Sequence, residues 1–124
     1  MKVARSLVAV VDDEECIRKA LQRLMVSAGL AVEAFSSGAE FLDWLKEQRP
    51  ACVVLDLHMP GVSGFEVQSR LAKANDRLPL IFITGNHTDE TKQRVTNGGA
   101  AAYFTKPVDD EMLLAAVRAA IGKP

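Results

Sequence analysis

The sequence contains little cysteine and no long apolar run. Its two cysteines, Cys16 and Cys52, lie far apart and lack the close spacing of a metal site or a redox motif. Cys52 falls inside an apolar run, which favours a buried hydrophobic role over a reactive one. No apolar stretch approaches the roughly 20 residues of a membrane span, and the run Leu7–Val11 after residues 1–5 is too short for a secretory signal. These absences exclude disulfide-stapled and membrane-spanning proteins and favour a cytoplasmic one.

An excess of one charge is also missing, because 15 basic and 16 acidic residues give a net charge of −1. A nucleic-acid-binding face needs clustered lysine and arginine, so this balance gives no indication of direct nucleic-acid binding.

The chain is long enough to form one domain. A length of 124 residues with 48% hydrophobic and 25% charged residues is typical of a single globular domain that needs no disulfide or structural metal. We therefore expect one domain over residues 1–124.

Short apolar runs alternate with helical patterns along the whole chain. The runs predict five strands, at residues 7–11, 31–35, 51–55, 80–83 and 100–104. The runs at residues 7–11 and 51–55 are continuously apolar, as strands buried on both faces of a parallel sheet are. In the first helical pattern, Ile17, Leu21 and Met25 recur at helical spacing, and Gly29 ends it. This alternation predicts an α/β fold with a parallel sheet and helices on both faces.

Two helix starts carry a capping box, in which a serine is followed three residues later by a glutamate. These are Ser37 with Glu40 and Ser63 with Glu66. The helix predicted at residues 88–98 is different, since Val95 is its only large apolar residue. So thin an apolar stripe predicts weak anchoring to the core.

Polar side chains follow four of the predicted strands. Asp12 and Asp13 come after the first strand, Asp56 after the third, Thr84 after the fourth and Lys106 after the fifth. The carboxyl ends of parallel strands meet at one edge of the sheet, where ligands bind in doubly wound folds. Each residue alone has an ordinary explanation, such as a helix cap or a solvated lysine. Capping does not explain the convergence of three carboxylates with a lysine and a hydroxyl.

This set of side chains suits phosphoryl transfer. Three adjacent carboxylates repel one another, and a hard cation such as Mg²⁺, or Mn²⁺, relieves that repulsion. The cation and the lysine neutralise an incoming phosphoryl group, and the threonine hydroxyl donates to one of its oxygens. A carboxylate nucleophile forms an aspartyl phosphate in other enzymes. The residues therefore predict Mg²⁺-dependent phosphorylation of an aspartate.

Four segments occur in a characteristic order, namely residues 10–14 (VVDDE), 55–61 (LDLHMPG), 83–85 (ITG) and 103–107 (YFTKP). With them the chain resembles, over essentially its whole length, the response-regulator receiver domains of bacterial two-component signalling. The resemblance implies a flavodoxin-like (βα)5 fold, a doubly wound five-stranded parallel sheet with strand order 2-1-3-4-5. It also implies a single receiver domain over residues 1–124 that catalyses only its own phosphorylation and dephosphorylation.

The resemblance assigns roles to the residues at the strand ends. Asp56 would accept a phosphoryl group from a sensor histidine kinase or a phosphotransfer protein, and would also face the metal. Asp13 would ligate Mg²⁺ directly, and Asp12 would do so through water. The backbone carbonyl of His58 would be a further ligand. Lys106 would pair with the phosphoryl group.

The resemblance also implies a switch. Thr84 and Tyr103 match the family's switching pair, in which the hydroxyl moves toward the phosphoryl group and the aromatic ring turns inward. The helix at residues 88–98, the fifth strand and the last helix would form the output face. We expect phosphorylation to rearrange this face and promote a partner contact such as a homodimer. The resemblance is also compatible with a cis peptide bond between Lys106 and Pro107.

Two positions flank the phosphoryl group in the family and tune its hydrolysis, and here they hold His58 and Asn86. For the His58 side chain, an exposed loop histidine is favoured over a catalytic imidazole. His87 is also expected at the surface. Gly85 replaces a small alanine common at its position and predicts wider access to the site.

Other functions fit the sequence less well. A flavin carrier needs a glycine- and hydroxyl-rich phosphate loop after the first strand, where residues 12–15 are acidic instead. An aspartyl-phosphate phosphatase needs an acid two residues after its nucleophile, where His58 stands. A nucleotide hydrolase needs a glycine-rich phosphate loop that the sequence lacks. The remaining alternative is a degenerate receiver that acts as a phosphorylation-independent docking module, and the intact Asp56 and Lys106 argue against it.

Overall fold

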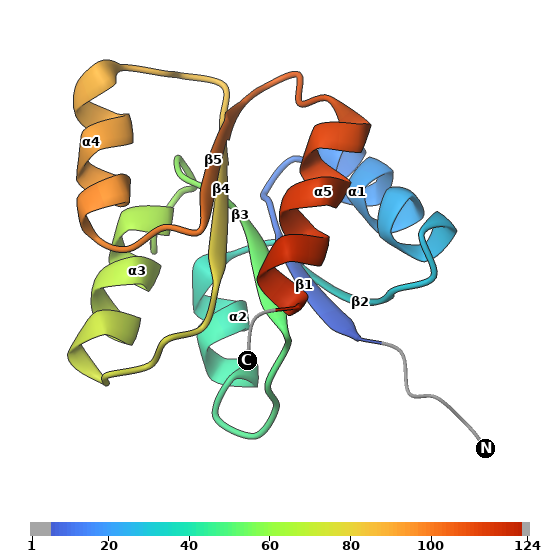
Figure 1. Ribbon diagram of the computed structural model, residues 1–124. Helices are drawn as coiled ribbons and strands as arrows, with labels where there is room; N and C mark the ends of the chain where they lie inside the picture. Colours follow the sequence, from blue (N-terminus) through green and yellow to red (C-terminus); the bar gives the residue numbers. More distant parts are fainter. Residues whose placement is uncertain (1–5, 123–124) are drawn as a thin grey trace.

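The computed structural model describes residues 6–122. Residues 1–5, which enter the argument against a secretory signal, and residues 123–124 lie outside this part of the chain. Within it, strands and helices alternate as the sequence predicts (Figure 1). The strands are β1 (Leu7–Val11), β2 (Ala31–Phe35), β3 (Cys52–Asp56), β4 (Leu80–Thr84) and β5 (Ala102–Thr105). The helices are α1 (Glu15–Ser27), α2 (Gly38–Trp44), α3 (Gly64–Lys73), α4 (Asp89–Asn97) and α5 (Asp110–Ile121).

The strands form one parallel sheet in the order β2-β1-β3-β4-β5. This confirms the predicted flavodoxin-like α/β class and its strand order. Helices α1 and α5 cover one face of the sheet, and α2, α3 and α4 cover the other (Figure 1). The chain reverses its direction of winding between β2 and β3, so β1 and β3 are neighbours although β2 separates them in sequence. Their carboxyl ends therefore meet at the switch point of the sheet.

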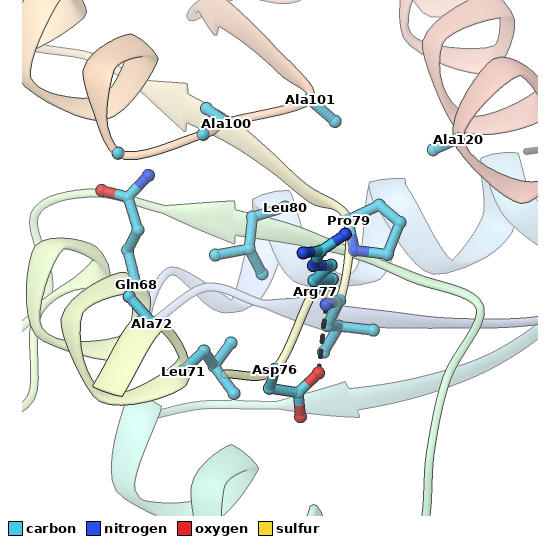
Figure 2. Close-up of a pocket in the computed structure, with 13 residues that line it drawn as sticks. Gln68, Leu71, Ala72, Asp76, Arg77, Pro79, Leu80, Ala100, Ala101 and Ala120 are labelled. Atoms are coloured by element: carbon cyan, nitrogen blue, oxygen red, sulfur yellow. Dashed lines mark hydrogen bonds between the residues drawn. The ribbon is translucent and has the colours of Figure 1, made fainter. Parts of the chain in front are cut away.

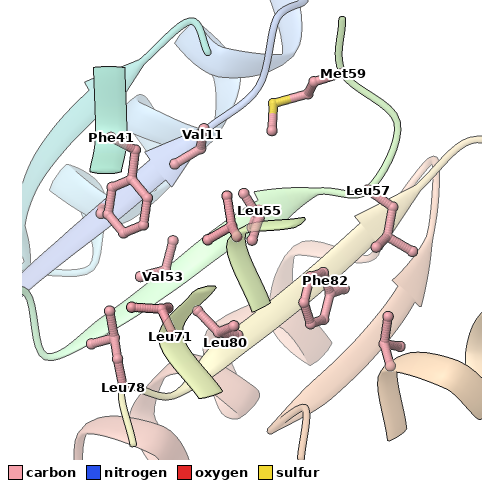
Figure 3. Packing of buried hydrophobic residues seen from close by; sticks show 13 residues of the cluster. Val11, Phe41, Val53, Leu55, Leu57, Met59, Leu71, Leu78, Leu80 and Phe82 are labelled. Carbon is pink, nitrogen blue, oxygen red and sulfur yellow. The ribbon is translucent and has the colours of Figure 1, made fainter. Parts of the chain in front are cut away.

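Two apolar cores lie between the sheet and its helices. One packs against α2, α3 and α4 and includes Val11, Phe41, Val53, Leu55, Leu71, Phe82 and Val95 (Figure 3). The other packs against α1 and α5 and includes Val8, Val10, Met25, Val54, Ile81, Ile83, Leu113 and Val117. Because successive residues of one strand face opposite cores, the central strands β1, β3 and β4 are apolar except at the carboxyl ends of β3 and β4, where Asp56 and Thr84 stand. Cys52 is fully buried, as expected, and burial raises the pKa of its thiol to about 12.

Local signals set most helix boundaries. The hydroxyls of Ser37 and Ser63 accept hydrogen bonds from the backbone N–H groups of Glu40 and Glu66, each at 3.2 Å. After α1 the backbone reaches the left-handed region at Gly29, with φ of 82°. No helix within residues 6–122 is long and apolar enough to cross a membrane.

In three of the strands, the predicted boundaries are wrong by one or two residues. The third and fourth strands were expected at residues 51–55 and 80–83, but β3 ends at Asp56 and β4 at Thr84. The fifth was expected at residues 100–104, but β5 starts at Ala102. Sheet pairing continues past the last apolar residue, since Asp56 lies opposite Ile83 and Thr84 lies opposite Thr105. Backbone hydrogen bonding between strands does not require an apolar side chain. A prediction that ends each strand at its last apolar residue therefore ends it too early.

Helix α4 is anchored by more than its apolar stripe. Thr88 caps it by accepting from the Thr91 N–H at 3.0 Å, and Val95 is fully buried as the sequence indicates. In addition, the buried Gln68 of α3 donates its side-chain N–H to the carbonyl of Val95 at 2.9 Å. The Arg94 guanidinium lies 4.0 Å from the ring centre of Phe65 on α3. Polar contacts between α3 and α4 thus supplement an anchoring that hydrophobic periodicity alone describes as weak.

Candidate functional site

The residues expected at the strand ends do gather at the carboxyl edge of the sheet. Asp12 and Asp13 follow β1, and Asp56 is the last residue of β3. Each of the three offers one carboxylate oxygen, and these oxygens all lie within 4.8 Å of one another. Asp12 and Asp56 are buried, with 0% and 3% of their surface exposed, whereas Asp13 faces solvent. Two acids are therefore fixed by the fold, and the third can meet a ligand that arrives from water.

Lys106 reaches into this cluster from the end of β5. Its Nζ lies 3.1 Å from Asp12 Oδ2, 3.1 Å from Glu14 Oε1 and 3.5 Å from Asp56 Oδ2. Its backbone N–H donates to the carbonyl of Thr84 at 2.8 Å, and the peptide bond that follows, to Pro107, is cis. The lysine is thus held at the rim by the sheet, with its ammonium group facing three acids.

The charge balance of the site is shifted by burial. Burial raises the pKa of Asp56 to about 6, although Lys106 pulls it down, and the nearby Asp12 adds to the rise. Burial also raises the pKa of Asp12, against the hydrogen bond from Glu14 N–H and the charge of Lys106. For Lys106, burial lowers the pKa, but the charges of Asp56 and Asp12 outweigh it and the net shift is upward. The charge of one lysine therefore does not offset the desolvation of the two buried carboxylates.

The donor set fits a hard divalent cation. Asp12 Oδ1 accepts from the Glu14 N–H at 2.9 Å. The other oxygen, Oδ2, is buried and contacts the Lys106 ammonium, but it is not aligned for a hydrogen bond with any group in residues 6–122. A buried carboxylate oxygen with unused lone pairs, beside two further carboxylates, suits Mg²⁺ or Mn²⁺ better than softer metals.

The loop after β3 is held tightly against the acceptor strand. The Gly64 N–H donates to the carbonyl of Leu57 at 3.0 Å. A Cβ at Gly64 would lie 2.6 Å from the carbonyl oxygen of Asp56, so a residue larger than glycine does not fit there without a shift. The His58 N–H approaches Asp56 Oδ1 at 3.4 Å, while its side chain is exposed with its ring 5.9 Å from Phe65. The backbone of His58 therefore lies beside the acidic cluster, and its exposed imidazole lies near Phe65.

Thr84 and Tyr103 lie on neighbouring strands but are not in contact through their hydroxyls. Thr84 is fully buried, and its hydroxyl accepts from the backbone N–H of Asn86 at 3.0 Å. Tyr103 is half-buried, and its hydroxyl lies 2.7 Å from Nδ1 of His87. Gly85 is exposed, and a Cβ there would meet only the Lys106 side chain, at 3.8 Å. A Cβ would therefore fit at this position in ordinary contact with the lysine, and wider access through the glycine stays a prediction.

Two contacts of the site were not predicted from the sequence. Glu14 pairs with Lys106 across 92 positions of sequence, and His87 pairs with Tyr103 across 16. The acidic run at residues 12–15 is a signal for Glu14, but it does not say which acid faces the lysine. Nothing in the sequence distinguishes His87 from any other loop histidine.

A separate hollow of about 440 Å³ lies at the opposite, amino-terminal end of β4 and β5 (Figure 2). Gln68, Leu80, Ala100 and Ala120 line it. Its acidic residue, Asp76, is engaged by a two-point contact with Arg49 and by the Leu78 N–H. The hollow is thus far from the acidic cluster along the strands and offers no comparable chemistry.

The burial of Asp56 gives a stability prediction. The folded pKa of about 6 lies above the ordinary aspartate pKa of 3.8, so the folded protein holds this proton at a higher pH than the unfolded chain. The ionised carboxylate therefore destabilises the metal-free fold above pH 6, and this cost fades as the pH falls toward 4. Asp56→Asn is expected to raise the free energy of unfolding by about 2–3 kcal/mol at pH 8 and by little at pH 4.

Urea unfolding in EDTA at both pH values measures this difference. Asp43→Asn, at an exposed side chain of α2, is the matched control and is expected to change little at either pH. An equal gain at pH 4 and pH 8 for Asp56→Asn would contradict the electrostatic explanation.

The strand order, with a buried acidic cluster and a lysine at the carboxyl edge, defines a receiver-type signalling domain. The chain belongs to the response regulator receiver domain family, whose sequence model matches residues 8–118. It is 38% identical to the response regulator protein TodT of Pseudomonas putida over 116 aligned residues. The aligned region covers 94% of this chain and 51% of TodT. The chain spans about half the length of the curated relatives it matches.

Solved structures agree in fold. A response regulator receiver protein from Burkholderia phymatum is 40% identical, with a TM-score of 0.84 over 97% of this chain and 98% of that chain. The FixJ-N crystal structure is 30% identical, with a TM-score of 0.88 over 98% of each chain. The family resemblance and the fold class expected from the sequence are thus confirmed.

Proposed function

We propose that this chain, as a single receiver domain over residues 1–124, is the phosphoacceptor of a cytoplasmic two-component pathway. Asp56 takes a phosphoryl group from a phosphohistidine of a sensor histidine kinase or a phosphotransfer protein. The observation that carries the proposal is the buried Asp56 carboxylate, 3.5 Å from the ammonium of Lys106 and grouped with Asp12 and Asp13. The partner is a protein, and we propose no direct contact of this domain with nucleic acid or membrane.

The transfer is a substitution at phosphorus. A carboxylate oxygen of Asp56 attacks, the new P–O bond forms, and the P–N bond to the donor histidine breaks with its electron pair left on the imidazole nitrogen. Lys106 exchanges its present acidic contacts for a phosphoryl oxygen, and the Thr84 hydroxyl donates to another. The domain is not an enzyme for a separate substrate, since it acts only on its own aspartate.

Metal binding belongs to the same proposal. Asp13 would ligate the ion directly and Asp12 through water, and Asp56 and the His58 backbone carbonyl would be the protein's other ligands. When bound, Mg²⁺ or Mn²⁺ offsets the charge of the carboxylates and of the incoming phosphoryl group. The buried Asp12 Oδ2, which contacts Lys106 but has no aligned hydrogen bond within residues 6–122, and the raised pKa of Asp12, caused by burial, support this ligand set.

Hydrolysis of the aspartyl phosphate ends the signal. The family resemblance implies that positions 58 and 86, here His58 and Asn86, flank the phosphoryl group, and both residues are exposed. We propose that these two residues set how easily water approaches the phosphorus. Gly85, beside Lys106, carries no side chain that would obstruct that approach.

Phosphorylation is read through Thr84 and Tyr103. The hydroxyl of Thr84 leaves the Asn86 N–H for the phosphoryl group, and the ring of Tyr103 turns inward into the space that is vacated. The face formed by α4, β5 and α5 changes shape and binds a partner, which includes a second copy of the domain. The adjacency of β4 and β5, with Phe82 opposite Tyr103, supports this coupling.

The experiment that tests the acceptor is incubation with acetyl phosphate and Mg²⁺, followed by intact-mass measurement. The wild-type protein is expected to gain one phosphoryl group per chain. If the wild-type protein binds Mg²⁺ but gains no phosphoryl mass, the proposed phosphorylation of Asp56 is contradicted.

The output face gives a second prediction. Beryllofluoride with Mg²⁺, which mimics the phosphoryl group on Asp56, is expected to shift the domain toward a dimer in analytical ultracentrifugation. Thr84→Ala removes the hydroxyl that transmits the change and is expected to bind beryllofluoride without dimerising. Unchanged sedimentation of the wild-type domain with bound beryllofluoride would refute the dimer as the output.

A further inference from the structure

Tyr103 is tied to a residue of the loop between β4 and α4. Its hydroxyl oxygen lies 2.7 Å from Nδ1 of His87, and the two ring centres are 5.5 Å apart at an angle of 59°. The contact fixes the exposed end of a tyrosine whose ring packs at the edge of the apolar core. The hydrogen bond between Tyr103 and His87 therefore restrains the orientation of the Tyr103 ring.

The other nitrogen of His87 faces the start of α4. Its Nε2 lies 3.4 Å from Oδ1 of Asp89, the first residue of that helix. A proton on Nε2 faces the Asp89 carboxylate and leaves Nδ1 to accept the hydroxyl proton of Tyr103. Burial, with a contribution from Asp89, raises the pKa of Tyr103. The hydroxyl therefore stays protonated and serves as the hydrogen-bond donor to Nδ1. The imidazole thus bridges β5 and α4.

The same loop holds both members of the proposed switching pair. Thr84 accepts from the N–H of Asn86, and Tyr103 is bonded to the side chain of His87. Motion of the Thr84 hydroxyl toward the phosphoryl group breaks the first contact, and inward rotation of Tyr103 breaks the second. Both contacts therefore favour the resting arrangement.

We propose that His87 is a positioning residue that holds Tyr103 at the surface in the unphosphorylated domain and so sets how readily the domain switches. The proposal rests on the proposed function of Asp56, because phosphorylation is the event that this contact opposes. A typical hydrogen bond shifts an equilibrium by about fivefold. Removal of the imidazole is expected to raise the ratio of inward to outward Tyr103 by about that factor.

The single tyrosine of the chain makes the orientation measurable. Protein labelled with 3-fluorotyrosine gives one ¹⁹F resonance, which reports the surroundings of the Tyr103 ring without any phosphodonor. His87→Ala is expected to move this resonance toward the position found with beryllofluoride. His87→Gln retains a hydrogen-bond acceptor and is expected to restore much of the wild-type position. Lys92→Ala, at an exposed residue of α4, is the control and is expected to leave the resonance in place.

A beryllofluoride titration separates this proposal from the function on which it rests. If His87 holds the resting state, His87→Ala reaches half-maximal switching at a beryllofluoride concentration about fivefold lower than wild type. Asp56→Asn is expected to abolish the response in both backgrounds. A wild-type domain that never responds overturns the proposed function. An unmoved resonance in His87→Ala overturns the role of His87 whatever the beryllofluoride result.

Discussion

Asp56→Asn protein is expected to gain no phosphoryl mass from acetyl phosphate and Mg²⁺, whereas the wild-type domain gains one group. The amide has nearly the shape of the carboxylate, but its nitrogen and oxygen are poor nucleophiles and form no stable acyl phosphate. The substitution is expected to leave the fold intact, because it removes a buried charge whose pKa burial raises to about 6. The loss therefore reports chemistry and not unfolding.

Asp43→Asn is the matched control for this experiment, since it makes the same change on the exposed face of α2. It is expected to label as the wild type does. Equal labelling of Asp56→Asn would move the acceptor to another acid of the cluster. Absence of labelling in a wild-type domain that binds Mg²⁺ would instead favour the docking-module alternative.

Asp13→Ala is expected to abolish detectable Mg²⁺ binding. Loss of residues that merely orient metal ligands weakens metal sites by about 10–100-fold, and loss of a direct ligand exceeds that. Asp13 is the exposed acid of the cluster, so its removal leaves the buried Asp12 and Asp56 in place and disturbs no core packing. Isothermal titration calorimetry measures the affinity, and Mn²⁺ paramagnetic resonance gives an independent count of bound ions.

Thr88→Ala is the control for metal binding. It removes the cap of α4, which accepts from the Thr91 N–H at 3.0 Å, and is expected to cost about 1 kcal/mol of stability. Its Mg²⁺ affinity is expected to equal that of the wild type, because Thr88 offers nothing to the acidic cluster. Unaltered Mg²⁺ affinity in Asp13→Ala would remove Asp13 from the ligand set.

The general arrangement of the site was predictable from the sequence. Alternating apolar runs and helical patterns indicate parallel strands, and parallel strands bring their carboxyl ends to one edge. Asp12, Asp13 and Asp56 are therefore placed together before any coordinate is known, and the structure finds them grouped. The roles of acceptor and metal ligand come from chemistry and family resemblance, and they stay predictions that the experiments above test.

The strand ends show a limit of pattern reading. Asp56 and Thr84 were expected after their strands and instead occupy the last positions of β3 and β4. Hydrophobicity reports which side chains are buried, whereas the strand continues as long as its backbone finds a partner. Both polar residues are buried, at 3% and 0% exposure, because the ladder carries them inside the rim.

The sequence by itself determined the fold class, the placement of the acidic cluster and most helix caps, since these follow from periodicity and from contacts a few residues apart. Tertiary structure alone decided that Glu14 meets Lys106, that Gln68 supports α4 and that His87 meets Tyr103. Such contacts join side chains from different elements. Their partners are set by the twist and packing of the sheet and its helices, for which no short-range pattern in the chain carries a signal.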